Sequence, residues 1–191
     1  MMRSFFIFLL LFIFRETILA QGGAAAVPFQ RKGLFLGMGF GAGTLQLSAN
    51  DTSTKAFSFS IPNIKIGYML TNRFGMMIFL PGSTYQYRGK VRGFEGVTIA
   101  AQYWVKDRWW LLAGSGVTFD APAFYTVQDP KEAEFYFGFP AITAGTGIEI
   151  YRKGKFAIDL QYRFFMGKSL LRNNQFREGT ANFFLVGFNW Y

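Results

Sequence analysis

The chain has 191 residues, of which 51% are hydrophobic, 20% are aromatic and only 16% are charged, with a formal net charge of +9. It contains no cysteine and no histidine, which excludes disulfides, thiolate metal sites and every catalytic or metal-binding arrangement that depends on an imidazole. The chain is also too apolar for a disordered or nucleic-acid-binding segment. We therefore expect no enzymatic activity, no cofactor, no metal and no nucleic-acid partner.

The N-terminus has the pattern of a secretory signal peptide. A basic residue precedes an unbroken apolar run over residues 5–14, which is too short to cross a bilayer core of about 30 Å as a helix. We predict a cleaved signal peptide over residues 1–20, with cleavage after Ala26 as the alternative. A periplasmic segment would then cover residues 21–33.

Beyond this segment, eight stretches alternate apolar residues with small or polar ones, as β-strands do. The predicted strands cover residues 34–47, 57–70, 74–87, 94–105, 109–119, 138–151, 156–166 and 180–191. The apolar set is rich in aromatic residues, whereas the other set is rich in glycine and carries a few charges. This reverses the arrangement of a soluble β-protein. It predicts an all-β fold, an eight-stranded antiparallel up-and-down transmembrane β-barrel over residues 34–191, with lipid outside and a polar lumen.

The connections between these strands alternate short and long. The short turns cover residues 71–73, 106–108 and 152–155, and the long loops cover residues 49–56, 88–93, 121–137 and 167–179. Such alternation predicts short turns in the periplasm and long loops outside the cell. The loop 121–137 is the candidate for a protein partner, because aromatic residues flank its charges: Phe124, Tyr125, Phe135, Tyr136 and Phe137 around Asp129, Lys131, Glu132 and Glu134. The alternative is that its aromatic ends simply continue the neighbouring strands.

Two neighbouring strands break their alternation. In residues 57–70 the outward set changes phase at Pro62, and in residues 74–87 a change at Pro81 would turn Tyr85 and Tyr87 outward. Counting from the short turn puts the two prolines nearly opposite each other. We predict a paired bulge that serves curvature, with a functional role as the alternative.

Four charged residues fall on inward faces of the predicted strands: Lys65, Glu149, Asp159 and Arg163. A one-residue slip of residues 156–166 would place Asp159 and Arg163 in lipid, which determines the register of that strand. Because unpaired buried charges are costly, we predict a paired network that plugs the lumen. The alternative is a gate that opens when the network is broken.

The glycine-rich first strand, the topology and the C-terminal sequence FFLVGFNWY together resemble the small eight-stranded outer-membrane barrels, such as OmpX and the transmembrane domain of OmpA. The resemblance implies an outer-membrane location and a C-terminal signal for the barrel-assembly machinery, formed here by Phe188, Trp190 and Tyr191. In that family an apolar residue stands third from the end, where this chain has Asn189. Either Trp190 is therefore the outward anchor or the last residue is bulged.

Six basic residues of the predicted second and fourth loops are candidates for contacting lipopolysaccharide phosphates: Arg88, Lys90, Arg92, Lys168, Arg172 and Arg177. The function predicted from these features is that of a structural or interaction barrel. Its lumen would be plugged by side chains, and its loops would contact lipopolysaccharide or a partner. A small channel or transporter is the alternative, although eight strands leave little internal space. An outer-membrane enzyme or a soluble binder of lipocalin type agrees less well with the sequence.

Overall fold

The computed structural model describes residues 29–49, 52–60, 62–87, 89–123, 134–171 and 174–191. The predicted signal peptide and most of the predicted periplasmic segment lie outside these residues. No helix formed by the described residues is long and apolar enough to cross a membrane.

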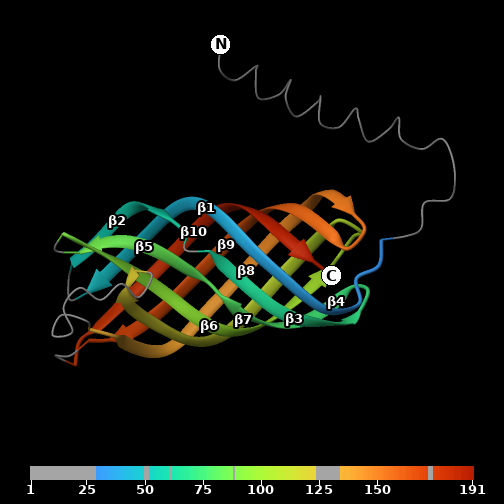
Figure 1. Ribbon diagram of the computed structural model, residues 1–191. Coiled ribbons are helices and arrows are strands. Elements are labelled where there is room, and N and C mark those ends of the chain that lie inside the picture. Colours follow the sequence, from blue (N-terminus) through green and yellow to red (C-terminus); the bar gives the residue numbers. More distant parts are fainter. Residues whose placement is uncertain (1–28, 50–51, 61, 88, 124–133, 172–173) are drawn as a thin grey trace, which may run out of the picture.

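The described residues form an antiparallel β-barrel (Figure 1). Its strands are β1 (Gly33–Ala49), β2 (Thr52–Phe59), β3 (Asn63–Thr71), β4 (Phe74–Leu80), β5 (Gly82–Tyr87), β6 (Lys90–Trp104), β7 (Trp109–Pro122), β8 (Tyr136–Lys153), β9 (Phe156–Leu170) and β10 (Phe176–Trp190). β10 pairs with β1 and closes the ring. Because β2 and β3 are halves of one strand, as are β4 and β5, the wall has eight strands, and the predicted eight-stranded barrel is confirmed.

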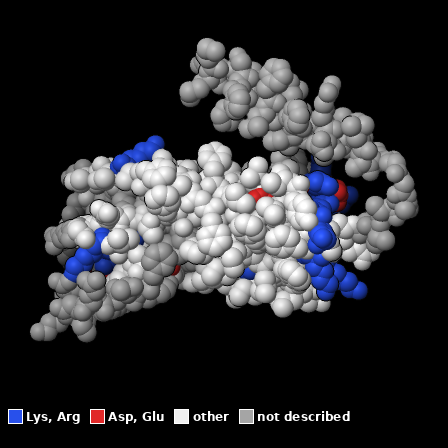
Figure 2. All heavy atoms as spheres, turned by 45° about the horizontal axis from the view of Figure 1, so that its top comes forward, with Lys and Arg blue, Asp and Glu red and all other residues white. Residues whose placement is uncertain are grey.

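The outside of the barrel carries an apolar belt. On β1, Leu34, Leu36, Met38 and Phe40 are between 45% and 63% exposed, and on β10 Phe184 is 73% exposed. Lys and Arg gather toward the two ends of the barrel, and the wall between them shows few charges (Figure 2). An exposed apolar surface of this extent on the outside of a barrel is typical of a lipid-facing wall.

The strands extend further at the loop end than the sequence predicts. Ala49 pairs with Thr52 and Tyr87 pairs with Lys90, so each of the first two loop-end connections has only two residues between its strands. The predicted loops over residues 49–56 and 88–93, and with them the strict alternation of short and long, are therefore wrong. Threonine and serine favour pairing above the belt, where Ser53 accepts a hydrogen bond from Gln46 at 3.0 Å.

Of the two predicted phase changes, the structure contains one. Ala42 pairs with Phe59 and Gly39 with Asn63, so three residues of the β2–β3 strand oppose two of β1, which is a bulge. In contrast, β4 and β5 keep a single register against β6. Pro81 lacks one ladder donor, yet its carbonyl still accepts the Gly96 N–H at 2.8 Å. Tyr85 consequently faces the lumen, not the outside as predicted.

Candidate functional site

Buried polar side chains form three layers across the lumen. The short-turn layer contains Arg31, Trp104, Glu149, Arg152 and Tyr191. The middle layer contains Lys65, Gln102, Trp110, Asp159, Gln161, Arg163 and Asn189. The loop-end layer contains Tyr85, Arg92, Asp120 and Arg177.

The short-turn layer is centred on Glu149, which is fully buried. Arg31 lies just before β1, and the bend at Gly33, with φ at 80°, joins it to the strand. The Arg31 guanidinium enters the lumen, where Nη2 lies 2.7 Å from Glu149 Oε2 and the guanidinium carbon lies 4.5 Å from the Trp104 ring centroid. The segment before β1 therefore reaches into the barrel mouth.

Three further donors complete the shell around the Glu149 carboxylate. Trp104 Nε1 donates at 3.0 Å, the Tyr191 hydroxyl at 2.9 Å and Arg152 Nε at 2.6 Å. Two guanidinium groups and two neutral donors thus compensate the desolvation of one buried carboxylate.

The middle layer holds the other three predicted lumen residues, Lys65, Asp159 and Arg163, all of which are buried. Trp110 Nε1 and Asn189 Nδ2 each donate to Asp159 Oδ2 at 3.0 Å. Lys65 Nζ donates to Gln102 Oε1 at 3.2 Å, and Arg163 Nε donates to Gln161 Oε1 at 2.9 Å.

The predicted pairing of these charges therefore requires a correction. Within the described part of the chain, no ion pair joins Lys65, Glu149, Asp159 and Arg163 to one another. Neutral side chains connect the middle-layer charges. Gln161 lies between Arg163 and Asp159, and Trp110 donates to Asp159 while its ring centroid lies 5.2 Å from Lys65 Nζ. Glu149 belongs to a different layer, with Arg31 and Arg152 as its partners.

In the loop-end layer, two guanidinium groups share the fully buried carboxylate of Asp120. Arg92 Nε lies 2.7 Å from Oδ1, and Arg177 Nη1 lies 2.5 Å from Oδ2. The Tyr85 hydroxyl donates to Oδ2 at 2.6 Å. The prediction that Arg92 and Arg177 face lipopolysaccharide is therefore wrong: β6 and β10 extend past their predicted ends, and the alternation of these strands turns both arginines inward.

The other predicted lipopolysaccharide-facing residues have different surroundings. Lys90 is exposed. Lys168 is partly exposed and pairs with Glu178 at 3.2 Å. Arg88 and Arg172 lie outside the described residues, as do residues 124–133 of the loop 121–137. At the end of that loop, β8 begins at Tyr136, which agrees with the alternative that its aromatic residues continue a strand.

The C-terminal aromatic residues lie on opposite faces of the wall. Phe188 and Trp190 point outward, with Trp190 58% exposed, whereas Tyr191 is buried in the lumen. Of the two alternatives for these last residues, the structure has the unbulged one, in which Trp190 faces outward and pairs in register with Leu36.

Some residues of these layers escaped sequence reasoning. Arg31 falls in the predicted periplasmic segment, and its partner Glu149 comes near it only when the barrel closes. Arg152 falls in a predicted turn, although its partner Glu149 is only three positions earlier in the sequence. Asp120 follows directly after the predicted strand 109–119; the inward alternation of Gly116 and Thr118 was a signal that could have included it. No group of three or more acidic residues among those described could hold a metal ion.

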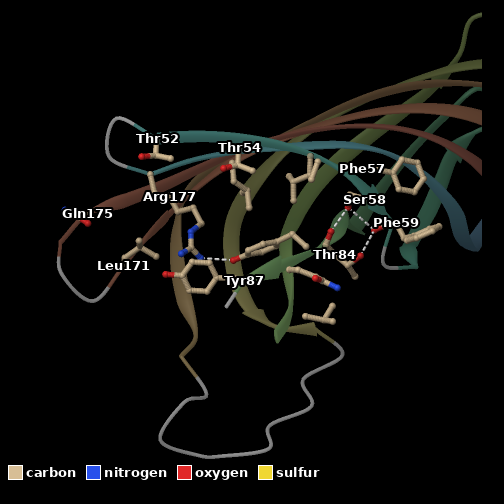
Figure 3. Close-up of a pocket in the computed structure, with 17 residues that line it drawn as sticks. Thr52, Thr54, Phe57, Ser58, Phe59, Thr84, Tyr87, Leu171, Gln175 and Arg177 are labelled. Atoms are coloured by element: carbon tan, nitrogen blue, oxygen red, sulfur yellow. Dashed lines mark hydrogen bonds between the residues drawn. The ribbon is translucent and has the colours of Figure 1, made fainter. Parts of the chain in front are cut away.

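Between the middle and loop-end layers, apolar side chains fill the lumen: Leu45, Phe94, Ala141, Phe165, Ala181, Phe183 and Leu185. Above them lies a cavity of about 920 Å³ between β2 and β5 (Figure 3). Ser60, directly after β2, forms an isolated bridge with Ser83 of β5. Beyond it, Ser58 Oγ donates to the Thr84 carbonyl at 2.6 Å, and Thr84 Oγ1 donates to the Phe59 carbonyl at 3.2 Å.

The sequence matches no protein-family model and no curated protein, but its fold is similar to solved structures. Neisserial surface protein A has 18% identity and a TM-score of 0.54, with 83% of this chain and 96% of that protein covered. Ail, the attachment invasion locus protein of Yersinia pestis, has 13% identity and a TM-score of 0.51, with 84% of this chain and 100% of that protein covered.

The chain therefore has the fold of the small eight-stranded outer-membrane β-barrels. Together with the apolar belt, this fold places the protein in the outer membrane.

Proposed function

We propose that the protein is a closed outer-membrane barrel with a structural or interaction role, which it performs at its loop end without conducting ions or catalysing a reaction. The observation that carries this proposal is the set of buried side-chain layers across the lumen. Trp104 and Trp110 are fully buried there, and so are the charged groups of Glu149 and Asp159. Eight strands enclose a space just wide enough for side chains to fill.

The accessibility of single introduced cysteines tests whether the lumen is closed. The chain has no native cysteine, so there is no background labelling. Ala100→Cys places a thiol in the buried lumen, and Thr54→Cys places one at an exposed position above it. In proteoliposomes, a membrane-impermeant maleimide should label Thr54→Cys and leave Ala100→Cys unmodified from either side. Labelling of Ala100→Cys at the rate of Thr54→Cys would show an open lumen.

The interaction role that we propose has two parts: the loop end contacts lipopolysaccharide phosphates, and the loop 121–137 contacts a protein partner. Lys90 is exposed. Lys168 is held only weakly by its surface ion pair with Glu178. Arg88 and Arg172 belong to the same proposed contact because both fall in the predicted loop-end connections of the sequence. During biogenesis, Phe188, Trp190 and Tyr191 would contact the barrel-assembly machinery.

Neutralising Arg88, Lys90, Lys168 and Arg172 to glutamine should weaken binding to lipopolysaccharide vesicles and flatten its salt dependence. Arg73→Gln is the matched control, because Arg73 is exposed in a short turn at the opposite end. Binding that is equal in the two variants would leave the loop-end cations as solvated charges.

A further inference from the structure

The barrel wall has an unpaired stretch at its loop end. In the described residues, β2 pairs in a ladder only with β1, and β5 only with β6. Past the bridge between Ser60 and Ser83, the facing edges of β2 and β5 are linked by the hydroxyl groups of Ser58 and Thr84 in place of a backbone ladder. Unpaired strand edges at membrane depth are tolerated only where they are buried in protein or line a water-filled cavity.

The cavity at this gap is lined from both faces of the wall. Ala56 is opposite Leu45 in the β1–β2 register, so both face the lumen. Phe57 and Phe59 face outward, with 68% and 63% of their surfaces exposed. All four residues line the same cavity, which therefore reaches the edge of the wall between β2 and β5. Its volume of about 920 Å³ lies within the range of small-molecule sites, roughly 300 to 1,000 Å³.

The gap begins where the apolar belt ends. On the outer face of β1, Phe40 is the last large apolar residue, and Thr44, Gln46 and Ser48 follow it. Phe59 pairs with Ala42, one outward position above Phe40. The lateral opening is therefore at the boundary between hydrocarbon and headgroups, where an amphiphile has its chain in lipid and its headgroup in water.

The inner part of the cavity combines apolar side chains with a cation. Leu45 and Leu47 pack on the apolar cluster that closes the lumen below. Arg177 also lines the cavity. Among the described residues, Arg177 makes both of its hydrogen bonds through Nη1, to Tyr85 and Asp120. The N–H groups of Nε and Nη2 are therefore available to donate to a ligand. Asp120 is shared with a second guanidinium, that of Arg92, and a further anion beside Arg177 is electrostatically favourable.

We propose that this cavity binds a single-chain amphiphile with an anionic headgroup, of the long-chain fatty acid class, which enters sideways from the membrane between β2 and β5. The chain lies against Leu45 and Leu47, and the carboxylate is bound by Arg177. Because the apolar cluster and the middle layer close the lumen below the cavity, the site is a binding pocket and not a path through the barrel.

Photolabelling in phosphatidylcholine nanodiscs tests this site. The probe is a fatty acid with a diazirine near the end of its chain, its comparison is the corresponding alcohol, and peptide mass spectrometry locates the adducts. Annular lipid reaches outward residues such as Phe184, whereas only a molecule inside the cavity reaches Leu45 and Leu47. We expect saturable labelling of these two leucines by the acid.

Three variants separate the contributions. Ala56→Trp fills the cavity and should lower labelling of Leu45 and Leu47 at least fivefold. Ser53→Trp adds the same bulk to the outward face of the same strand, as its pairing with Ser48 shows, and should leave the labelling unchanged. Arg177→Gln should reduce labelling by the acid to the level of the alcohol. Heat-dependent gel migration checks that each variant is folded.

Labelling confined to outward residues, or equal in wild type and Ala56→Trp, would overturn the proposal. Equal labelling of the leucines by acid and alcohol in the wild type would overturn the assignment of an anionic headgroup. Arg177→Lys provides a second check, since it keeps the charge: labelling by the acid should exceed that in Arg177→Gln.

Discussion

Arg31, which precedes the first strand, is linked to Glu149 in β8 by an ion pair of 2.7 Å whose side chains are 1% and 0% exposed. The two residues are 118 positions apart in the sequence. The pair attaches the chain segment before the barrel to the far wall of the lumen, and the Arg31 guanidinium also donates to the Asp107 carbonyl at 2.6 Å. The segment thus serves as part of the closure at the short-turn end.

The first prediction concerns this pair. Arg31→Ala removes one partner of a buried carboxylate and should lower the free energy of unfolding by about 3 kcal/mol, at the lower end of the range for broken buried pairs because Arg152 remains. Urea unfolding in lipid vesicles measures the loss. Arg73→Ala, at an exposed turn position, is the control and should change stability by less than about 0.5 kcal/mol. Equal effects of the two variants would show that Arg31 contributes nothing specific.

The second prediction compares the members of the loop-end layer. Asp120→Asn leaves two buried guanidinium groups without a carboxylate, whereas Arg92→Gln leaves Asp120 still paired with Arg177. The aspartate variant should therefore be the less stable of the two, by about 1–3 kcal/mol. Unfolding midpoints of both variants under the same conditions measure the difference. The reverse order would contradict the shared-carboxylate arrangement.

The sequence predicted the wall of the barrel better than its interior. The alternation along β9 correctly predicts that Asp159 and Arg163 face inward. A strand has a period of two, and the free-energy cost of a charge in lipid selects one of the two phases. Which side chains meet in the lumen depends on their heights along the barrel axis and on the order of the strands around the barrel. A local sequence pattern contains neither. Arg31 is a lumen residue for that reason only in the folded barrel. Arg92 and Arg177 fall in predicted loops for another reason, since β6 and β10 begin earlier than the predicted starts at residues 94 and 180.

Tyr85 shows a second limit of sequence reasoning. The proline before it indicated a phase change, since prolines often mark irregular strand positions. Pairing with β6 held the register, however, and placed the Tyr85 hydroxyl on Asp120. The backbone pairing with β6 continues on both sides of Pro81 in one register, so it outweighed the local effect of the proline.

The third prediction concerns the glycines of the inner face. A Cβ at Gly187 would collide with the Gln161 amide and the Asp159 carboxylate, whereas a Cβ at Gly39 would meet its nearest atom at 3.7 Å. Gly187→Ala should therefore destabilise the barrel by about 1–3 kcal/mol by displacing the middle layer. Gly39→Ala, on the same inner surface, should be tolerated within about 0.5 kcal/mol. If both substitutions were tolerated, the middle layer would be looser than its geometry indicates.

The fourth prediction concerns assembly. Trp190 points outward and lies beside Phe156, with ring centroids 6.2 Å apart, while Tyr191 is bound to Glu149 inside the lumen. Trp190→Ala should slow insertion into the outer membrane in cells, whereas Tyr191→Phe should lower stability and leave the insertion rate unchanged. Pulse-chase measurement of heat-modifiable protein separates the two effects. Slower insertion of Tyr191→Phe than of Trp190→Ala would assign the signal to the last residue.

Planar-bilayer recording tests the central claim, that side chains close the lumen, most directly. The wild-type protein should give no steady conductance at any applied voltage that the bilayer withstands, since its lumen is occupied by the short-turn and middle layers and by the apolar cluster above them. A reproducible, ion-selective current through the wild type, altered by Lys65→Ala or Glu149→Ala, would contradict the closed barrel and establish the channel instead.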